Sequence, residues 1–102
     1  MDHLTIFKAL ANETRLQILQ WLKEPEQNFP SGSLSDEHDF KDGICVGKIQ
    51  EKAGMSQSTT SQYLSLLQRS GLLEARRIGQ WTYYRRNEEA IRRLAEYIGK
   101  EL

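Results

Sequence analysis

The sequence predicts a mainly α-helical fold with a small β-hairpin, in the order α-α-α-α-β-β-α. Apolar residues recur with helical spacing along most of the chain. Two runs of β-forming residues flank a short loop that contains a glycine, which is typical of a hairpin. The length of 102 residues corresponds to about one domain. We therefore expect residues 1–102 to form a single domain.

The first two expected helices meet at Asn12. The first helix has one apolar stripe, formed by Leu4, Phe7, Leu10 and Ala11. Asn12 is typical of a helix N-cap, because its side-chain oxygen accepts hydrogen bonds from the free amides of the helix that follows. The second helix has a broad apolar face, and we expect it to end by Glu24, because the residue before Pro25 disfavours the helical conformation.

Residues 25–43 show no sustained period, and we expect them to form a long surface loop, with room for a short turn of helix. Six acidic residues and one basic residue lie between Glu24 and Asp42. This acidic loop insertion has two open interpretations. It is either a solvated insertion or a surface that contacts a partner or an effector.

A second pair of helices follows the acidic loop. Apolar periodicity resumes at Ile44, and we expect a short helix with Val46, Ile49 and Ala53 on its apolar face. Gly54 suits the left-handed conformation that ends this helix. Ser56 can cap the next helix, and Gly71 can end it. The inner stripe of that helix is Thr60, Leu64 and Leu67. The tight Gly-Met-Ser turn between the two helices predicts a helix-turn-helix.

The outer face of the helix expected over 56–69 is polar but uncharged. Its side chains are Gln57, Ser58, Thr59, Ser61, Gln62 and Ser65. A helix built for solvation carries Lys and Glu pairs, whereas a helix that enters the major groove of DNA needs uncharged donors and acceptors for base edges. The amides at its N-terminus can also hold a phosphate. This face predicts sequence-specific contact with double-stranded DNA.

The hairpin expected over 73–86 is basic, with Gln80 near its tip. Its arginines, expected at the two strand ends, are Arg76, Arg77, Arg85 and Arg86. Like charges on adjacent strands repel each other. The nearby acids Glu74, Glu88 and Glu89 can offset one or two of these arginines, but not all four. DNA phosphate is the natural anion for the others, so we expect the hairpin to lie on the DNA backbone.

The aromatic residues of the hairpin and one further helix complete the expected fold. We expect Trp81, Tyr83 and Tyr84 to pack in the core and across the strands, which is more common in hairpins than stacking on single-stranded bases. Asn87 is typical of the N-cap of a last helix. The apolar stripe of that helix is Ile91, Leu94, Ile98 and Leu102.

Three motifs stand in order and at regular spacing in the chain. They are FKALANETRL at 7–16, SQSTTSQYL at 56–64, and Arg76-Arg77-x-Gly79-x-x-x-Tyr83-Tyr84 in the hairpin. Together they resemble the bacterial ArsR/SmtB-type winged helix-turn-helix repressors. The likeness covers nearly the whole chain outside residues 25–43.

This resemblance implies a homodimer that assembles through the first and last helices, binds a pseudo-palindromic operator and is released by an effector, which the sequence does not identify. The motif positions that imply contact with the DNA groove are Gln57, Ser58, Thr59, Ser61 and Gln62. The wing positions are Arg76, Arg77 and Gln80. Two departures concern DNA contact: Tyr63 stands where these repressors usually have His, and Gln80 where the wing often has Arg.

The metal-sensing motifs of the family are not found in the sequence. Metal sensors of this type carry Cys-x-Cys-Asp at the third helix, where this chain has Cys45-Val46-Gly47-Lys48. Zinc sensors place Asp and His on the last helix, which here offers Glu and no His. We therefore expect no metal site and no other cofactor, and we interpret Cys45 as a structural thiol.

Composition and charge bear on the remaining classes of function. No apolar run approaches the roughly 18 residues of a membrane span, and the single cysteine fits a cytoplasmic protein. No nucleophile–base pair or phosphate-binding glycine loop indicates an enzyme. The formal net charge of zero conceals seven bases and two acids between Lys48 and Arg86, as a DNA-binding unit requires. The alternative is a winged-helix protein-interaction module that uses the acidic 25–43 loop.

Overall fold

The computed structural model describes residues 2–37 and 39–102, and its elements follow the predicted order with two additions. The elements are α1 (His3–Leu10), α2 (Glu13–Lys23), α3 (Pro25–Asn28), β1 (Ile44–Cys45), α4 (Val46–Ala53), α5 (Gln57–Arg69), β2 (Leu73–Ile78), β3 (Trp81–Arg86) and α6 (Glu88–Glu101). The additions are the short helix α3 and the two-residue strand β1. None of the helices in the described ranges is long and apolar enough to cross a membrane.

The predicted hairpin is part of a three-stranded antiparallel sheet with the order β1-β3-β2. Ile44 pairs with Tyr84, and Cys45 pairs with Tyr83. The apolar pattern that resumes at Ile44 therefore begins in a strand, and the expected short helix follows as α4, which begins at Val46. The reason is that Ile44 is fully buried against the hairpin, and a β-branched side chain suits a pleated, buried strand.

The core lies where α2, α4 and α5 pack over the start of the sheet. The predicted inner stripe of α5 is confirmed, because Thr60, Leu64 and Leu67 are fully buried. The Thr60 hydroxyl donates to the Ser56 carbonyl oxygen at 2.8 Å, so this buried polar group is satisfied. Ile18 of α2 and Ile49 of α4 are also fully buried, and both belong to this core.

The predicted helix caps are confirmed by the structure. The side-chain oxygen of Asn12 accepts from the Arg15 amide at 3.0 Å, and that of Asn87 accepts from the Ala90 amide at 3.1 Å. Ser56 Oγ accepts from the Thr59 amide at 3.1 Å. Gly54 has φ +66°, the left-handed conformation that ends α4. These caps fix where α2, α5 and α6 begin.

The apolar stripe expected for the first helix is only partly buried. Ile6 and Ala9 are buried, whereas Leu4 is 61% exposed. The reason is that α1 carries two apolar faces, and α2 and α5 contact the one that contains Ile6. Leu4 is left at the surface, whereas Phe7 and Leu10 of the same stripe are half-buried and pack against the core. On α6, likewise, Leu94 is buried while Ile98 is 45% exposed.

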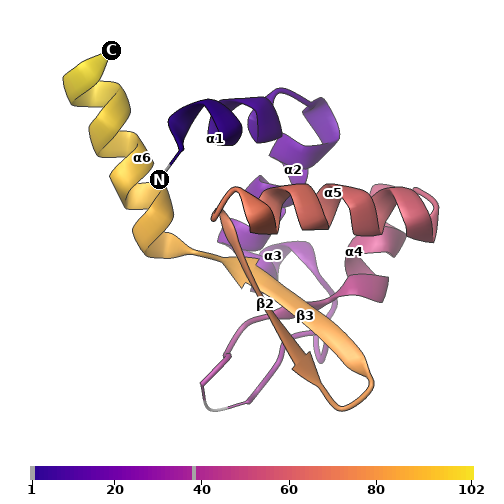
Figure 1. Ribbon diagram of the computed structural model, residues 1–102. Helices are drawn as coiled ribbons and strands as arrows, with labels where there is room; N and C mark the ends of the chain where they lie inside the picture. The colour runs from indigo at the N-terminus through magenta and orange to yellow at the C-terminus, as the bar shows by residue number, and fades with distance from the viewer. Residues whose placement is uncertain (1, 38) are drawn as a thin grey trace.

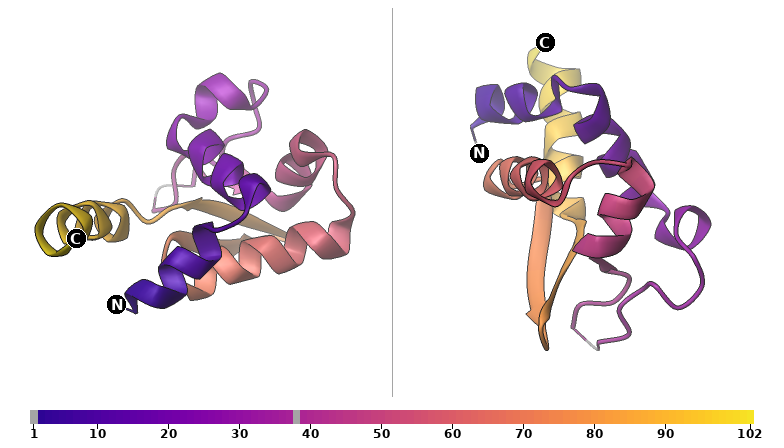
Figure 2. Two further views of the ribbon diagram at one scale, coloured as in Figure 1. Left: turned by 90° about the horizontal axis from the view of Figure 1, so that it is seen from above. Right: turned by 90° about the vertical axis from the view of Figure 1, so that its right-hand side faces the viewer.

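α1 and α6 lie at the same end of the molecule, and α6 forms its edge (Figures 1 and 2). The His3 and Tyr97 rings stack at a centroid distance of 3.5 Å and join the two helices. Phe7 also contacts Tyr97, at 6.4 Å between ring centroids. The exposed apolar side chains of both helices are therefore close to one another.

The 25–43 segment contains the short helical turn that the sequence allows, and it folds back on the sheet. Phe29 and Phe40 are buried. Leu34 forms an isolated bridge with Ile44. The Ser35 amide donates to the Gly43 carbonyl at 2.8 Å, and the Asp42 amide donates to the Ser35 carbonyl at 3.0 Å. The segment therefore lies beside the hairpin (Figure 1), held there by both backbone bonds and burial.

Candidate nucleic-acid interface

The outer face of α5 carries free hydrogen-bonding side chains. Gln57, Ser61 and Gln62 are exposed, and none of the three makes a side-chain hydrogen bond to another described residue. Ser61 and Gln62 line a shallow hollow on this face together with Ser65, Leu66 and Arg69. The amides and hydroxyls of this face are therefore available to an external partner.

Hydroxyl groups gather at the N-terminus of α5. Ser56 Oγ donates to Thr59 Oγ1 at 3.0 Å and lies 3.4 Å from Ser58 Oγ. Thr59 is half-buried, while Ser58 is exposed. Because Ser58 and Thr59 belong to the cap, their hydroxyls are held in place. Such a terminus, with its free amides and hydroxyl donors, suits a phosphate group.

The hairpin arginines lie near the ends of their two strands, as expected, but these ends are at opposite ends of the hairpin. Antiparallel pairing places Arg76 opposite Tyr83 and Arg77 opposite Thr82, toward the tip. Arg85 and Arg86 lie at the base, opposite Glu74 and Leu73 respectively. No two of these arginines face each other across the strands, so direct cross-strand repulsion does not occur in this register.

Three of the four hairpin arginines form ion pairs. Arg85 Nε lies 3.0 Å from Glu74 Oε1, and Arg86 Nη2 lies 2.9 Å from Glu88 Oε1, so two arginines pair with nearby glutamates as the sequence allows. The third pair is unexpected, because Arg76 Nη1 lies 2.8 Å from Oδ1 of Asp39 in the acidic segment. Arg77 alone among the four has no acidic partner within the described residues, and its Nε donates to the Gly79 carbonyl at 3.3 Å.

The tip of the hairpin presents Gln80 and Trp81. Gly79 has φ +63°, which the tight turn requires and which a residue without a Cβ adopts readily. Gln80 is exposed, and Trp81 is 52% exposed opposite Ile78. Core packing is therefore confirmed for Tyr84, which contacts the core, but is wrong for Trp81. A ring at the end of a two-stranded ribbon has no neighbouring strand to cover it.

Three cations on the other flank of α5 were missed from the sequence. Lys8, Arg15 and Arg69 line a groove between α1 and α5 of about 550 Å³. Arg15 Nε donates to the Ala9 carbonyl at 2.6 Å, and its guanidinium lies 5.0 Å from the Tyr63 ring centroid. No acid pairs with these cations among the residues that the structure describes. The sequence holds one signal for two of them: neither Lys8 nor Arg69 has an acidic residue three or four positions away with which it could pair along a helix.

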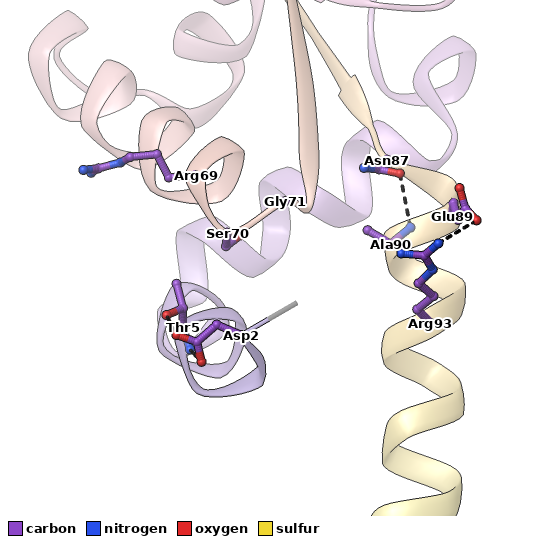
Figure 3. A pocket seen from close by; sticks show the side chains of 9 residues that line it. All are labelled: Asp2, Thr5, Arg69, Ser70, Gly71, Asn87, Glu89, Ala90 and Arg93. Atoms are coloured by element: carbon purple, nitrogen blue, oxygen red, sulfur yellow. Dashed lines mark hydrogen bonds and ion pairs between the residues drawn. The ribbon is translucent and has the colours of Figure 1, made fainter.

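A second hollow, of about 360 Å³, lies between α1, the end of α5 and the start of α6 (Figure 3). Its polar groups are bound to their own helices: Thr5 donates to Asp2 at 2.6 Å, and Arg93 donates to Glu89 at 3.1 Å. Figure 3 shows the Arg69 side chain pointing away from this hollow. The hollow therefore has no convergent set of free groups.

The described residues contain no cluster of three His, Cys, Asp or Glu side chains that could hold a metal ion. Cys45 is half-buried in β1. Its backbone pairs with Tyr83 in the sheet.

Comparison with known proteins identifies the family. No family model matches the chain. The chain is 51% identical to the HTH-type transcriptional regulator YbzH of Bacillus subtilis over 102 residues, which is all of both chains. It is 30% identical over 93 residues to the transcriptional activator HlyU of Vibrio cholerae, covering 91% of this chain and 70% of HlyU.

Solved structures agree with these relatives. One is the homodimeric winged helix-turn-helix DNA-binding domain Mb0332 of Mycobacterium bovis, a possible ArsR-family transcriptional regulator. It matches with a TM-score of 0.65 and 33% identity over 95% of this chain and 77% of that one. The solved structure of HlyU from Vibrio cholerae N16961 matches with a TM-score of 0.66 and 28% identity over 94% of this chain and 86% of that one. The chain thus belongs to the ArsR family of winged helix-turn-helix transcriptional regulators.

Proposed function

We propose that this chain is a cytoplasmic repressor that consists of a single domain and forms a homodimer. The homodimer binds a pseudo-palindromic DNA operator. α5 enters the major groove, and the β2–β3 wing lies on the backbone. The observation that carries this proposal is the outer face of α5, where exposed amides and hydroxyls without intramolecular partners stand between two groups of cations. Groove recognition needs this combination, because bases are read by hydrogen bonds while phosphates position the protein.

The base-reading residues in this proposal lie on α5. Gln57 and Gln62 each offer an amide that can bond adenine in two places, and Ser61 can bond several base edges. Ser58 and Thr59 stand at the capped N-terminus of α5, where amides and hydroxyls suit a phosphate. Each half-site of the operator therefore meets one α5.

The wing residues in this proposal are Arg76, Arg77 and Gln80. Arg77 is the strongest candidate for a phosphate contact, because its charge is not offset by a described acid. Gln80 stands exposed at the tip, where an amide can donate to a phosphate or a sugar oxygen. On the opposite flank, Lys8 and Arg69 add positive charge beside the groove-facing helix.

Dimer formation in this proposal uses α1 and α6. Leu4 is 61%, Ile98 45% and Leu102 79% exposed, and the stacking of His3 on Tyr97 keeps the two helices together. Exposed apolar residues that gather on neighbouring helices indicate an interface. The solved Mb0332 domain is described as homodimeric, which supports the same assembly here.

Binding to the DNA upstream of its own gene tests the proposal. Fluorescence anisotropy should show saturable binding to a labelled upstream duplex, with an affinity that falls steeply between about 50 and 200 mM salt. Footprinting should protect two half-sites about one helical turn apart. Binding that depends neither on sequence nor on salt would contradict the proposal. Reporter expression that falls when this gene is deleted would show an activator instead of a repressor.

A further inference from the structure

The acidic segment and the wing are joined by one ion pair that links residues distant in sequence. Asp39 Oδ1 accepts from Arg76 Nη1 at 2.8 Å. Both side chains are accessible, with exposed fractions of 65% for Asp39 and 42% for Arg76. Arg76 lies on β2 two positions from Ile78, the last residue of that strand. The acid therefore neutralises a cation on the part of the wing that we propose faces DNA.

Asp39 is held in this place by its neighbour Phe40. The Phe40 ring is buried, and its centroid lies 4.2 Å from the Arg85 guanidinium and 5.3 Å from that of Arg76. A Cβ at Gly43 would come within 2.6 Å of the Phe40 ring, so the backbone closes on that ring without room for a side chain. An anchored aromatic beside Asp39 limits how far its carboxylate can move.

The backbone of the same segment adds further constraints. The bonds from the Ser35 amide to the Gly43 carbonyl and from the Asp42 amide to the Ser35 carbonyl close the segment into a short loop. Arg85 Nη1 donates to the Lys41 carbonyl at 3.4 Å and attaches the loop to β3. Asp39 is therefore presented to Arg76 by a folded segment that contacts two strands of the wing.

We propose that Asp39 lowers the affinity of the wing for DNA of any sequence, because its carboxylate occupies on Arg76 the place that a DNA phosphate takes in the complex. Binding of the wing to DNA then exchanges one anion for another on the same guanidinium. Since phosphate contacts carry no base information, the exchange lowers the affinity for DNA of any sequence. The fraction of the binding energy that comes from base contacts on α5 rises accordingly. This inference rests on the proposed function.

The test compares two variants that remove the same charge from the same segment. Asp39→Asn breaks the ion pair, whereas Glu37→Gln neutralises an exposed acid for which the structure shows no ion pair. Affinity for a random-sequence duplex is measured by anisotropy over a range of salt. We expect Asp39→Asn to bind about two- to fivefold more tightly at low salt, as loss of an accessible competing pair implies. Its salt slope should be steeper by up to about one phosphate contact.

A double-mutant cycle then assigns the effect to the pair itself. In an Arg76→Gln background, Asp39→Asn should have no more effect than Glu37→Gln, because the cation that Asp39 neutralises is gone. Thermal melts of all variants check that each is folded at the temperature of the measurement.

The outcomes distinguish this inference from the function on which it rests. Equal effects of Asp39→Asn and Glu37→Gln would overturn the inference, because general charge would then explain both. Weaker binding by Asp39→Asn would also overturn it and would make Asp39 a support for Arg76. In both cases, saturable binding by the unmodified chain leaves the proposed function intact. Absence of any duplex binding by the unmodified chain would overturn both.

Discussion

Asn12 and Tyr63 join the turn between α1 and α2 to the middle of α5, because Asn12 Nδ2 donates to Tyr63 Oη at 3.4 Å. The same asparagine caps α2 through its Oδ1. The Arg15 guanidinium lies over the Tyr63 ring and bonds the end of α1. Tyr63 therefore helps to set the orientation of α5 relative to the first two helices, from the half-buried side of α5 and not from its groove-facing side.

Replacing Asn12 should cost more stability than losing a cap alone. Asn12→Ala removes both the cap and the bond to Tyr63, whereas Asn87→Ala removes only the cap of α6. We expect about 1 kcal/mol for a cap, and about 0.5 kcal/mol more for Asn12 from the long bond to Tyr63. Urea unfolding measures both, and Tyr63→Phe should reproduce the smaller part. Equal losses for the two asparagines would show that the bond to Tyr63 contributes nothing.

Gln62 should determine base preference. Gln62→Ala should lower the affinity for the preferred operator by about 1–3 kcal/mol and relax the preference at one position in each half-site. Gln68→Ala is the matched control, because Gln68 is exposed on the same helix but six residues further, on a different side. Selection of bound duplexes from a random pool measures the preference. An identical selected sequence for Gln62→Ala and the unmodified chain would contradict the role.

Arg77 should act on all DNA sequences alike. Arg77→Ala should weaken operator and random duplex by the same factor and reduce the salt slope by about 1. Arg92→Ala is the control, because Arg92 is an exposed arginine on α6 that pairs with Glu89. Anisotropy titrations at several salt concentrations measure both quantities. A loss confined to the operator would assign Arg77 to base reading and remove it from the backbone.

The apolar surface of α1 and α6 should be the dimer interface. Leu4→Glu and Ile98→Glu each place a charge on exposed apolar positions of these helices, and burying an unpaired charge at an interface is costly. We expect monomers in sedimentation velocity and a large loss of operator affinity. Leu16→Glu, at a position 43% exposed on α2, should leave the dimer intact. Dimers that persist in both α1 and α6 variants would exclude this interface.

Local rules in the sequence predicted the parts of the fold that depend on local contacts. The contacts of Ser56, Thr60 and Gly54 all lie within four residues along the chain. The cap of α5, its inner stripe and the end of α4 could therefore be predicted from the sequence. Strand β1 could not be predicted in this way, because Ile44 is part of a strand only through its pairing with Tyr84, which is distant in the chain. The sequence also did not show which face α1 buries, since the periodicity of apolar residues alone does not distinguish the buried Ile6 from the exposed Leu4.

The candidate interface was predictable to a similar degree. The polar face of α5 follows from helical spacing, and the structure places Gln57, Ser61 and Gln62 at the surface as expected. The neutralisation of Arg76 by Asp39 was not foreseen, because their contact depends on how residues 34–43 fold onto the sheet. The contribution of each of these residues to DNA binding stays a prediction, and the variants described above test it.

The effect of Asp39 on DNA binding should not depend on pH in the physiological range. The bond from Arg76, followed by its positive charge, holds the pKa of the Asp39 carboxyl below its ordinary value of 3.8, and Arg85 acts in the same direction. A group whose pKa is lowered in the folded state contributes stability above its unfolded pKa and loses it as pH falls through the folded value. The Asp39–Arg76 pair is therefore present throughout neutral pH and is lost only in acid.

The ratio of the affinities of Asp39→Asn and the unmodified chain for random duplex should consequently stay constant between about pH 5.5 and 8, where an aspartate with a lowered pKa remains ionised. Anisotropy titrations in buffers of equal ionic strength measure this ratio. Within the part of the chain that the structure describes, Arg76 and Arg85 are the residues whose charges lower the pKa of Asp39. A ratio that changes near pH 6 to 7 would contradict the expectation, because the charge that opposes DNA would then belong to a group with a histidine-like pKa.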